Sequence, residues 1–351
     1  MRLSNKTVRK ENVILSNETV RKDKILSNEK VRKDKILSNK TVRKENVILS
    51  NKIVRKDKIL SNKTVRKENV ILSNKTVRKD KCSNCFLHNF KYEIINSNIC
   101  KVQNDITVDI FIIIFSIPRN IANRNAIRKT WVSASRNNTA NTRYAFFFGI
   151  SSDKNILFQE AKIYKDIIME DFQDSYQNLT YKTMMGFKFV TLFCNNAKYI
   201  LKTDDDMWIN LNWLNEYLRT NSQKLINSVG GYCFKSASPI RKKSSKWYAG
   251  FESYPSKKYP GFCSGTGYIF TNKTAQQVFE ISRNVPFYHL EDVYVSLCIR
   301  QLGYTLEHIP GFRNGTGTNA DLCRYKKKSV ITWHKVPPGK LLKIWSKNCT
   351  Q

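Results

Sequence analysis

Two regions of very different composition make up this chain of 351 residues, and they meet near residue 81. Every Phe, Tyr, Trp, Cys, Gly and Pro of the chain lies after that point. A packed interior needs large apolar side chains, so residues 82–351 must supply it. The apolar content of 41% and aromatic content of 12% are too high for a wholly disordered chain.

Residues 1–81 form a repeat with units such as LSNKTVRKENVI, in which leucines recur every 11 or 12 residues. The apolar positions of a unit line neither one side of a helix nor one face of a strand. We therefore expect a solvated basic segment of net charge +16, disordered or loosely helical. The alternatives are a segment that binds nucleic acid or acidic glycans, a gene-model artefact and a recent repeat expansion.

The net charge of +33 would, taken alone, suggest a protein that binds nucleic acid or an anionic surface. Almost half of that charge belongs to the repeat, and residues 82–351 carry the remaining +17. The charge therefore does not by itself point to nucleic acid.

Membrane and secretion signals are mixed. The longest apolar run, Ile110–Ile117, is far shorter than the roughly 18–20 residues that span a bilayer. The N-terminus also lacks the apolar core of a secretory signal. Nine cysteines allow up to four disulfides and leave one over, and with several Asn-X-Ser/Thr sequons they hint at a secretory origin. Cys82 and Cys85 form a lone CxxC, for which zinc is not expected.

Strand and helix patterns alternate after residue 105. Apolar and β-rich runs predict strands at 109–117, 144–149, 166–169 and 198–203, and helical spacing predicts helices at 124–131, 176–194, 212–219, 272–282 and 291–302. This alternation indicates an α/β fold with a mainly parallel sheet flanked by helices. Ligands of such sheets bind beyond the carboxyl ends of the strands.

Three adjacent carboxylates, Asp204, Asp205 and Asp206, follow the predicted strand at 198–203. They repel one another, and a divalent cation such as Mg²⁺ or Mn²⁺ would compensate their charge. In an extended segment Asp204 and Asp206 point one way and Asp205 the other, so the outer pair serves metal and ligand while Asp205 holds the loop. A hydrated surface turn is the alternative.

Other candidates have simpler structural explanations beside the functional ones. Arg124 and Arg128 lie on one helix face and suit a diphosphate, or form a solvated basic face. Glu291 and Asp292 begin a helix. The helix dipole favours acids at that position, or one of them supplies a general base. The glycines of segment 263–267, CSGTG, allow the backbone to approach a ligand closely, or they belong to a plain tight turn.

Five segments, taken in order, resemble the β-1,3-galactosyltransferase and β-1,3-N-acetylglucosaminyltransferase family, glycosyltransferase family 31. They are RNAIRKTW at 124–131, DFQDSYQNLTYKT at 171–183, LKTDDDMWIN at 201–210, KWYAGFESYPSKKYPGFCSGTGYIFT at 246–271 and EDVYVSLCIRQLG at 291–303. The resemblance covers about residues 105–350. It divides the chain into the repeat at 1–81, a linker at 82–104 and a catalytic domain at 105–351.

The resemblance implies a GT-A fold that binds a UDP-sugar, behind the basic repeat extension. The DDD block of that family binds Mn²⁺ and the nucleotide, with Mg²⁺ as the alternative metal. Asp206 would then be a metal ligand, and Asp204 and Asp205 would belong to the nucleotide-binding block. A histidine completes the metal site in related enzymes, and His334 in ITWHK matches it.

The same resemblance assigns the remaining roles. Arg124 and Arg128 would help to bind the donor, UDP-galactose or UDP-N-acetylglucosamine. Asp292 would be the catalytic base of an inverting transfer to a sugar hydroxyl on a glycoprotein or glycolipid, forming a β-1,3 linkage. Trp247, Tyr248 and Tyr259 are candidates to stack on the acceptor sugar, with a place in the core as the alternative. Neither donor nor acceptor is resolved by a motif.

Family members begin with a short tail and a signal anchor, where this chain has the repeat. The resemblance of the catalytic domain alone implies a lumenal location at the Golgi membrane, because no anchor is visible in the sequence. Two other classes of protein stay open. One is an inactive, lectin-like member of the same fold, and the other is a binder of nucleic acid or an anionic surface through the repeat.

Overall fold

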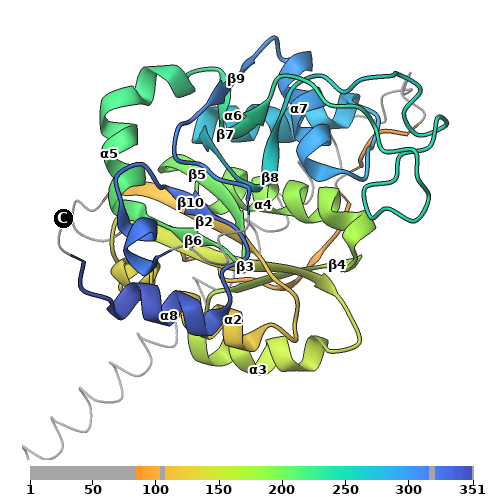
Figure 1. Cartoon of the computed structure of the whole chain (residues 1–351). Helices are drawn as coiled ribbons and strands as arrows, with labels where there is room; N and C mark the ends of the chain where they lie inside the picture. The colour runs from red at the N-terminus through yellow and green to blue at the C-terminus, as the bar shows by residue number, and fades with distance from the viewer. Residues whose placement is uncertain (1–83, 88, 103–106, 316–320, 350–351) are drawn as a thin grey trace, which may run out of the picture. The chain divides into compact units, whose positions relative to one another are not determined.

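The computed structural model describes residues 84–349 except 88, 103–106 and 316–320 (Figure 1). The predicted repeat at 1–81 lies outside the described residues. The strands are β1 (Tyr92–Ile94), β2 (Val108–Phe115), β3 (Thr142–Ile150), β4 (Ile167–Gln173), β5 (Ala197–Asp204), β6 (Trp208–Ile209), β7 (Ser228–Phe234), β8 (Phe262–Thr271), β9 (Thr305–His308) and β10 (Thr332–Trp333).

Helices alternate with these strands along most of the chain. The α-helices are α2 (Ile121–Lys129), α3 (Lys154–Tyr164), α4 (Leu179–Phe193), α5 (Leu211–Asn221), α6 (Asn272–Ile281), α7 (Glu291–Gln301) and α8 (Pro338–Ser346). Short 3₁₀ turns are η1 (Ser133–Ser135), η2 (Tyr176–Asn178), η3 (Ser222–Leu225), η4 (Ser282–Asn284) and η5 (Leu322–Lys326). No helix within the described ranges has the length and apolar character to cross a membrane.

One large mixed sheet has the strand order β1-β4-β3-β2-β5-β8-β7-β9. Strands β4, β3, β2 and β5 run parallel to their neighbours in this block, and β7 and β9 also pair in parallel. Strand β8 runs antiparallel to both β5 and β7, and β1 is antiparallel to β4. The prediction of an α/β fold with a mainly parallel sheet is confirmed.

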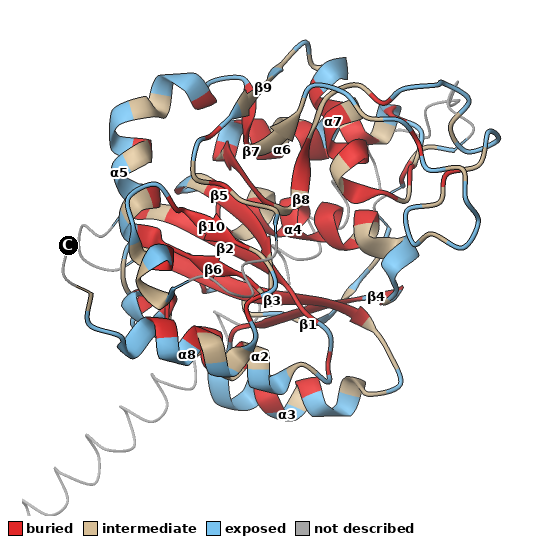
Figure 2. Cartoon of the chain, viewed as in Figure 1, coloured by how far each residue is buried: buried red, intermediate tan, exposed pale blue. Residues whose placement is uncertain are grey.

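Both faces of the sheet are covered by helices (Figures 1 and 2). Phe111 and Ile113 of β2 enter a core with α4, α6 and α7, whereas Ile110 and Ile112 enter a second core with α2, α3, α5 and α8. All four side chains are fully buried. Burial on both faces explains why this strand is a continuous apolar run.

The structure corrects one local prediction. Segment 263–267 is not a tight turn, because it lies inside β8. Glycines have low strand propensity, and pairing with β5 and β7 on both sides outweighs it here. By contrast, Gly303, two residues after the end of α7, has a φ of 71°, the left-handed conformation that favours glycine after a helix.

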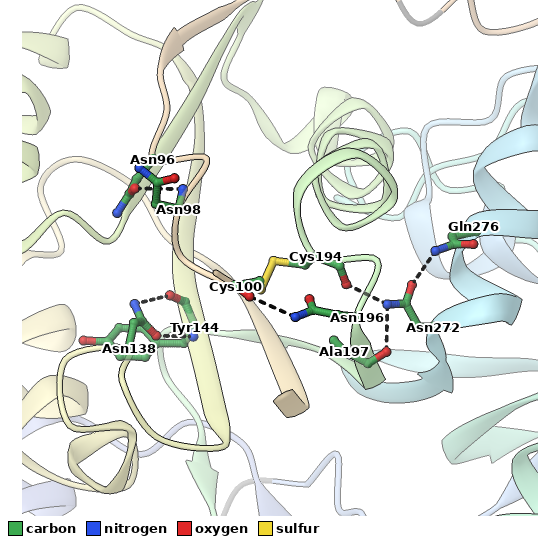
Figure 3. The surroundings of a disulfide bond; sticks show 10 residues. All are labelled: Asn96, Asn98, Cys100, Asn138, Tyr144, Cys194, Asn196, Ala197, Asn272 and Gln276. Atoms are coloured by element: carbon green, nitrogen blue, oxygen red, sulfur yellow. Dashed lines mark hydrogen bonds between the residues drawn. A yellow bond between two sulfur atoms is a disulfide. The ribbon is translucent and has the colours of Figure 1, made fainter. Parts of the chain in front are cut away.

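Disulfides join segments that are distant in sequence. The bonds are Cys100–Cys194, Cys233–Cys263 and Cys323–Cys349, and Cys85 is also disulfide-bonded. Asn196 and Asn272 donate hydrogen bonds to the carbonyls of Cys100 and Cys194, and so fasten the first bond to α6 (Figure 3). Several disulfides in one domain are typical of an oxidising, secretory compartment.

Candidate active site

A cavity of about 610 Å³ lies at the carboxyl end of β5. Its lining includes Asp204 of β5, Gly265 of β8, Asp292 of α7 and His334, which follows β10. The structure thus brings three of the predicted site residues, Asp204, Asp292 and His334, to one cavity. Its position is the one that parallel strands favour for a ligand site.

Asp205 is turned away from this lining and is 8% exposed. Its carboxylate accepts hydrogen bonds from the Ser116 hydroxyl at 2.6 Å and the Asn120 amide at 3.0 Å, both in the segment after β2. Burial raises the pKa of Asp205 to about 6, and the charges of Asp204 and Asp206 act in the same direction. Asp205 therefore holds the acidic loop in place, and the structure does not bring it to the cavity.

Arg124 and Arg128 also lie outside the cavity lining. Arg124 is fully buried and bonds Glu160, Ser116 and two backbone carbonyls after β2, which uses all five of its N–H donors. Arg128 bonds Asp166 at 2.8 Å and Glu160 at 2.7 Å. The expected contact of these arginines with the donor phosphates has no support in this arrangement.

The physical reason is that α3 brings Glu160, and the turn before β4 brings Asp166, against the arginines. Helical spacing places Arg124 and Arg128 on one face but does not reveal what that face meets. Because Arg124 also holds Ser116, it is a positioning residue for Asp205.

Asp292 lies in the first turn of α7 and faces the cavity. Its carboxylate accepts hydrogen bonds from the backbone N–H groups of Gly265 at 3.2 Å and Val293 at 2.9 Å. Burial and the neighbouring charge of Glu291 raise its pKa to about 7. A side chain at Gly265 would collide with Glu291, so the glycine permits the close approach of β8 to α7.

Lys202 is a central residue that the sequence reasoning missed. Its buried ammonium lies 2.9 Å from Asp204 and 3.1 Å from Glu291, and it also donates to the carbonyl of Gly265. Burial favours the neutral amine, but the two carboxylates outweigh it and raise the pKa of Lys202. A lysine inside the apolar strand run, two residues before the first of three acids, was the available signal.

Glu291 is correspondingly not a free capping acid. It is 5% exposed and accepts hydrogen bonds from Tyr268 at 2.7 Å and Thr183 at 3.1 Å besides its pairing with Lys202. Glu291 also lines the cavity, but hydrogen bonds inside the protein engage both its oxygens, so its role is to position Asp292.

The substitution Lys202→Met is expected to lower the free energy of unfolding by about 3 kcal/mol, because it leaves Glu291 buried and unpaired. Asp204 is one-third exposed and regains some hydration, which keeps the loss at the low end of the range for buried pairs. Urea unfolding measures the change.

Lys198→Met on the same strand is the control. Lys198 pairs with Asp109, and both side chains are exposed, so the expected loss is below about 1 kcal/mol. Equal losses in the two variants would contradict a special role for Lys202.

Asp206 is not among the residues that line the cavity, but it lies against one that is, with His334 Nε2 3.3 Å from Asp206 Oδ2. Burial favours the neutral imidazole, but the hydrogen bond to Asp206 and the charges of Asp206 and Asp204 raise the pKa of His334. Strands β10 and β6 pair and bring the two residues together across 128 positions of sequence.

No cluster of three or more His, Cys, Asp and Glu side chains suited to a metal ion occurs among the described residues. Mn²⁺ and Mg²⁺ need no such protein cage, because water and substrate phosphates complete their coordination. A carboxylate and an imidazole within 3.3 Å of each other therefore fit one shared cation with open positions.

Known proteins resemble this chain in sequence over most of the described residues. Residues 122–310 match the model of the family described as Galactosyltransferase. Beta-1,3-galactosyltransferase 1 of Mus musculus is 38% identical over 265 residues, covering 74% of this chain and 78% of the relative. Beta-1,3-galactosyltransferase 2 of Homo sapiens is 34% identical over 269 residues, covering 74% of this chain and 62% of the relative.

A solved glycosyltransferase involved in glycosylation of the major capsid of PBCV-1 aligns with a TM-score of 0.36 and 12% identity. It covers 68% of this chain and 100% of its own. A similarity this low adds no argument about the fold.

Proposed function

Because this chain belongs to the Galactosyltransferase family, we propose that it is an inverting, metal-dependent hexosyltransferase that forms a β-1,3 linkage. Its donor is UDP-galactose, with UDP-N-acetylglucosamine as the alternative, and its acceptor is a sugar hydroxyl on a glycoprotein or glycolipid. The observation that carries the proposal is that Asp292 lines the same cavity as Asp204 and His334.

The reaction needs one proton transfer and one displacement. Asp292 takes the proton of the acceptor hydroxyl, and the oxygen then bonds to the anomeric carbon from the face opposite UDP. The bond from that carbon to the UDP oxygen breaks, so an α-linked donor gives a β-linked product. A base with a pKa of about 7 is well matched to this proton transfer at neutral pH.

The remaining residues hold the reactants and the charge. Asp206 and His334 would hold Mn²⁺ or Mg²⁺, and the bound cation would neutralise the negative charge that develops on UDP as it leaves. Asp204 faces the cavity next to them and serves the nucleotide side of the site. Lys202 keeps Asp204 and the start of α7 at a fixed separation.

The fold and the compartment belong to the same proposal. A parallel block that ends at β5, with the acidic loop at its carboxyl end, supports the GT-A arrangement. The disulfides support a secretory location, and the family supports the Golgi lumen as that location.

A transfer assay with the full chain tests the function. UDP-galactose and UDP-N-acetylglucosamine are each offered with Mn²⁺ to acceptors that end in galactose or N-acetylglucosamine, and the new linkage is read by NMR. Transfer from UDP-galactose with a β-1,3 linkage is expected. Acceptor binding without transfer from either donor would favour the inactive, lectin-like alternative.

A further inference from the structure

The loop between β7 and β8, residues 235–261, concentrates positive charge beside the cavity; we call it the basic loop. It holds seven basic residues and one acid, and so carries +6 of the net +17 of residues 82–351. The seven are Lys235, Arg241, Lys242, Lys243, Lys246, Lys257 and Lys258. Figure 2 shows most of the loop exposed.

No carboxylate of the described part of the chain lies within 4.0 Å of any of these cations. Arg241 has a structural role, because it donates to the carbonyls of Ala249 and Ser256 and stacks on Phe251 at 4.0 Å. The six lysines of the loop have no acidic side chain as a partner among the described residues. Like charges gathered without counter-charges raise the local concentration of anions.

The basic loop is tied to the catalytic side of the cavity. His289, two residues before α7, bonds the carbonyl of Tyr248 at 3.0 Å. The hydroxyls of Tyr259 and Tyr288 are 2.6 Å apart. These contacts fix the loop next to the segment that leads into Asp292, so the position of its charge relative to the base is defined.

Two side chains of the basic loop face into the cavity itself. Lys246 and Trp247 both line it, and the Lys246 ammonium lies 4.7 Å from the centre of the Trp247 ring and 5.3 Å from that of Tyr176. Trp247 is 49% exposed, which leaves much of the indole open to a ligand. An aromatic face beside a cation that has no acidic partner among the described residues suits a sugar ring that carries an acidic group.

We propose that the acceptor is an anionic glycan, with a carboxylate or a sulfate close to the sugar that receives the transfer. Trp247 stacks on the acceptor and Lys246 pairs with its acidic group. This proposal rests on the proposed function. The donor diphosphate is not the anion in question, because Asp206 and His334 would hold its metal on the β5 and β10 side, whereas the loop is tied to the α7 side. A membrane surface is disfavoured because both side chains face the cavity.

Binding of three matched disaccharides to the full chain tests the proposal by calorimetry. They are N-acetyllactosamine, its 6-O-sulfate and the form with galacturonic acid in place of galactose. The wild type is expected to bind at least one acidic form about tenfold more tightly than the neutral one. The two acidic arms distinguish sulfate from carboxylate.

Lys246→Gln is expected to abolish that preference and to leave the affinity for the neutral disaccharide unchanged. Lys162→Gln, an exposed lysine on α3, is the control for the same loss of charge. It also accounts for background binding by the basic repeat, which both variants retain.

The outcomes separate the two proposals. Equal affinity for acidic and neutral forms, or equal effects of the two lysine variants, overturns the anionic acceptor. Binding to phosphatidylserine vesicles that Lys246→Gln reduces, without a preference among the disaccharides, overturns it in favour of a membrane surface. Acidic disaccharides that bind through Lys246 but receive no sugar from either donor contradict only the proposed function.

Discussion

Replacing Asp292 with Asn is expected to lower kcat by about 10²- to 10⁴-fold, the usual contribution of a positioned general base. The amide has the size of the carboxylate and can still accept a backbone hydrogen bond, but it takes no proton from the acceptor hydroxyl. Transfer of radiolabelled galactose measures the rate, and calorimetry with UDP shows that the donor site is intact.

Asp321→Asn is the control, because Asp321 is exposed and lies outside the cavity lining. It is expected to retain full activity. Turnover close to that of the wild type in a folded Asp292→Asn protein would remove Asp292 from the role of base.

The raised pKa of Asp292 also gives this variant a signature in pH. Since the deprotonated form is the base, kcat/KM of the wild type should fall about tenfold per unit as the pH drops below about 7. The residual rate of Asp292→Asn should lack this step. A wild-type profile that stays flat through pH 7 would contradict the assignment.

The raised pKa of Asp292 affects protein stability in the opposite sense: stability falls with rising pH, whereas activity rises. The folded-state pKa of Asp292 lies above its usual value, so its favourable contribution is present at low pH and is lost as the pH rises towards 7. Asp292→Asn should therefore be at least as stable as the wild type at pH 8, measured as the thermal midpoint. Lower activity with equal or higher stability distinguishes loss of the base from misfolding.

Removing the proposed metal site is the second large effect. Asp206→Ala is expected to lower transfer by about 10³-fold or more, because the charge that develops on UDP loses several kcal/mol of stabilisation. EDTA should abolish transfer by the wild type, and Mn²⁺ should restore it. The same Mn²⁺ concentration should not rescue the variant.

Binding of UDP gives a readout that does not depend on turnover. Calorimetry should show that Mn²⁺ tightens UDP binding to the wild type and has little effect on Asp206→Ala. Asp109→Ala, which removes an exposed acid at the opposite end of the parallel strands, should behave as the wild type. Transfer that ignores EDTA would exclude the metal assignment.

Local signals in the sequence determined several secondary-structure elements of this protein and the position of its acidic loop. Period and composition predicted the buried strand β2 and helix α7, because each depends on neighbours in sequence. The same holds for the position of the acidic loop, since a parallel strand places the residues that follow it at the ligand edge of the sheet.

Only the tertiary structure decided the partners of the charged side chains. Glu160 of α3 and Asp166, which precedes β4, neutralise Arg124 and Arg128, and α7 supplies the second carboxylate for Lys202. These partners lie between 36 and 89 positions away, and no local period encodes such a pairing. A buried charge needs a counter-charge in space, so packing rather than spacing determined which cations serve the fold and which acids face the cavity.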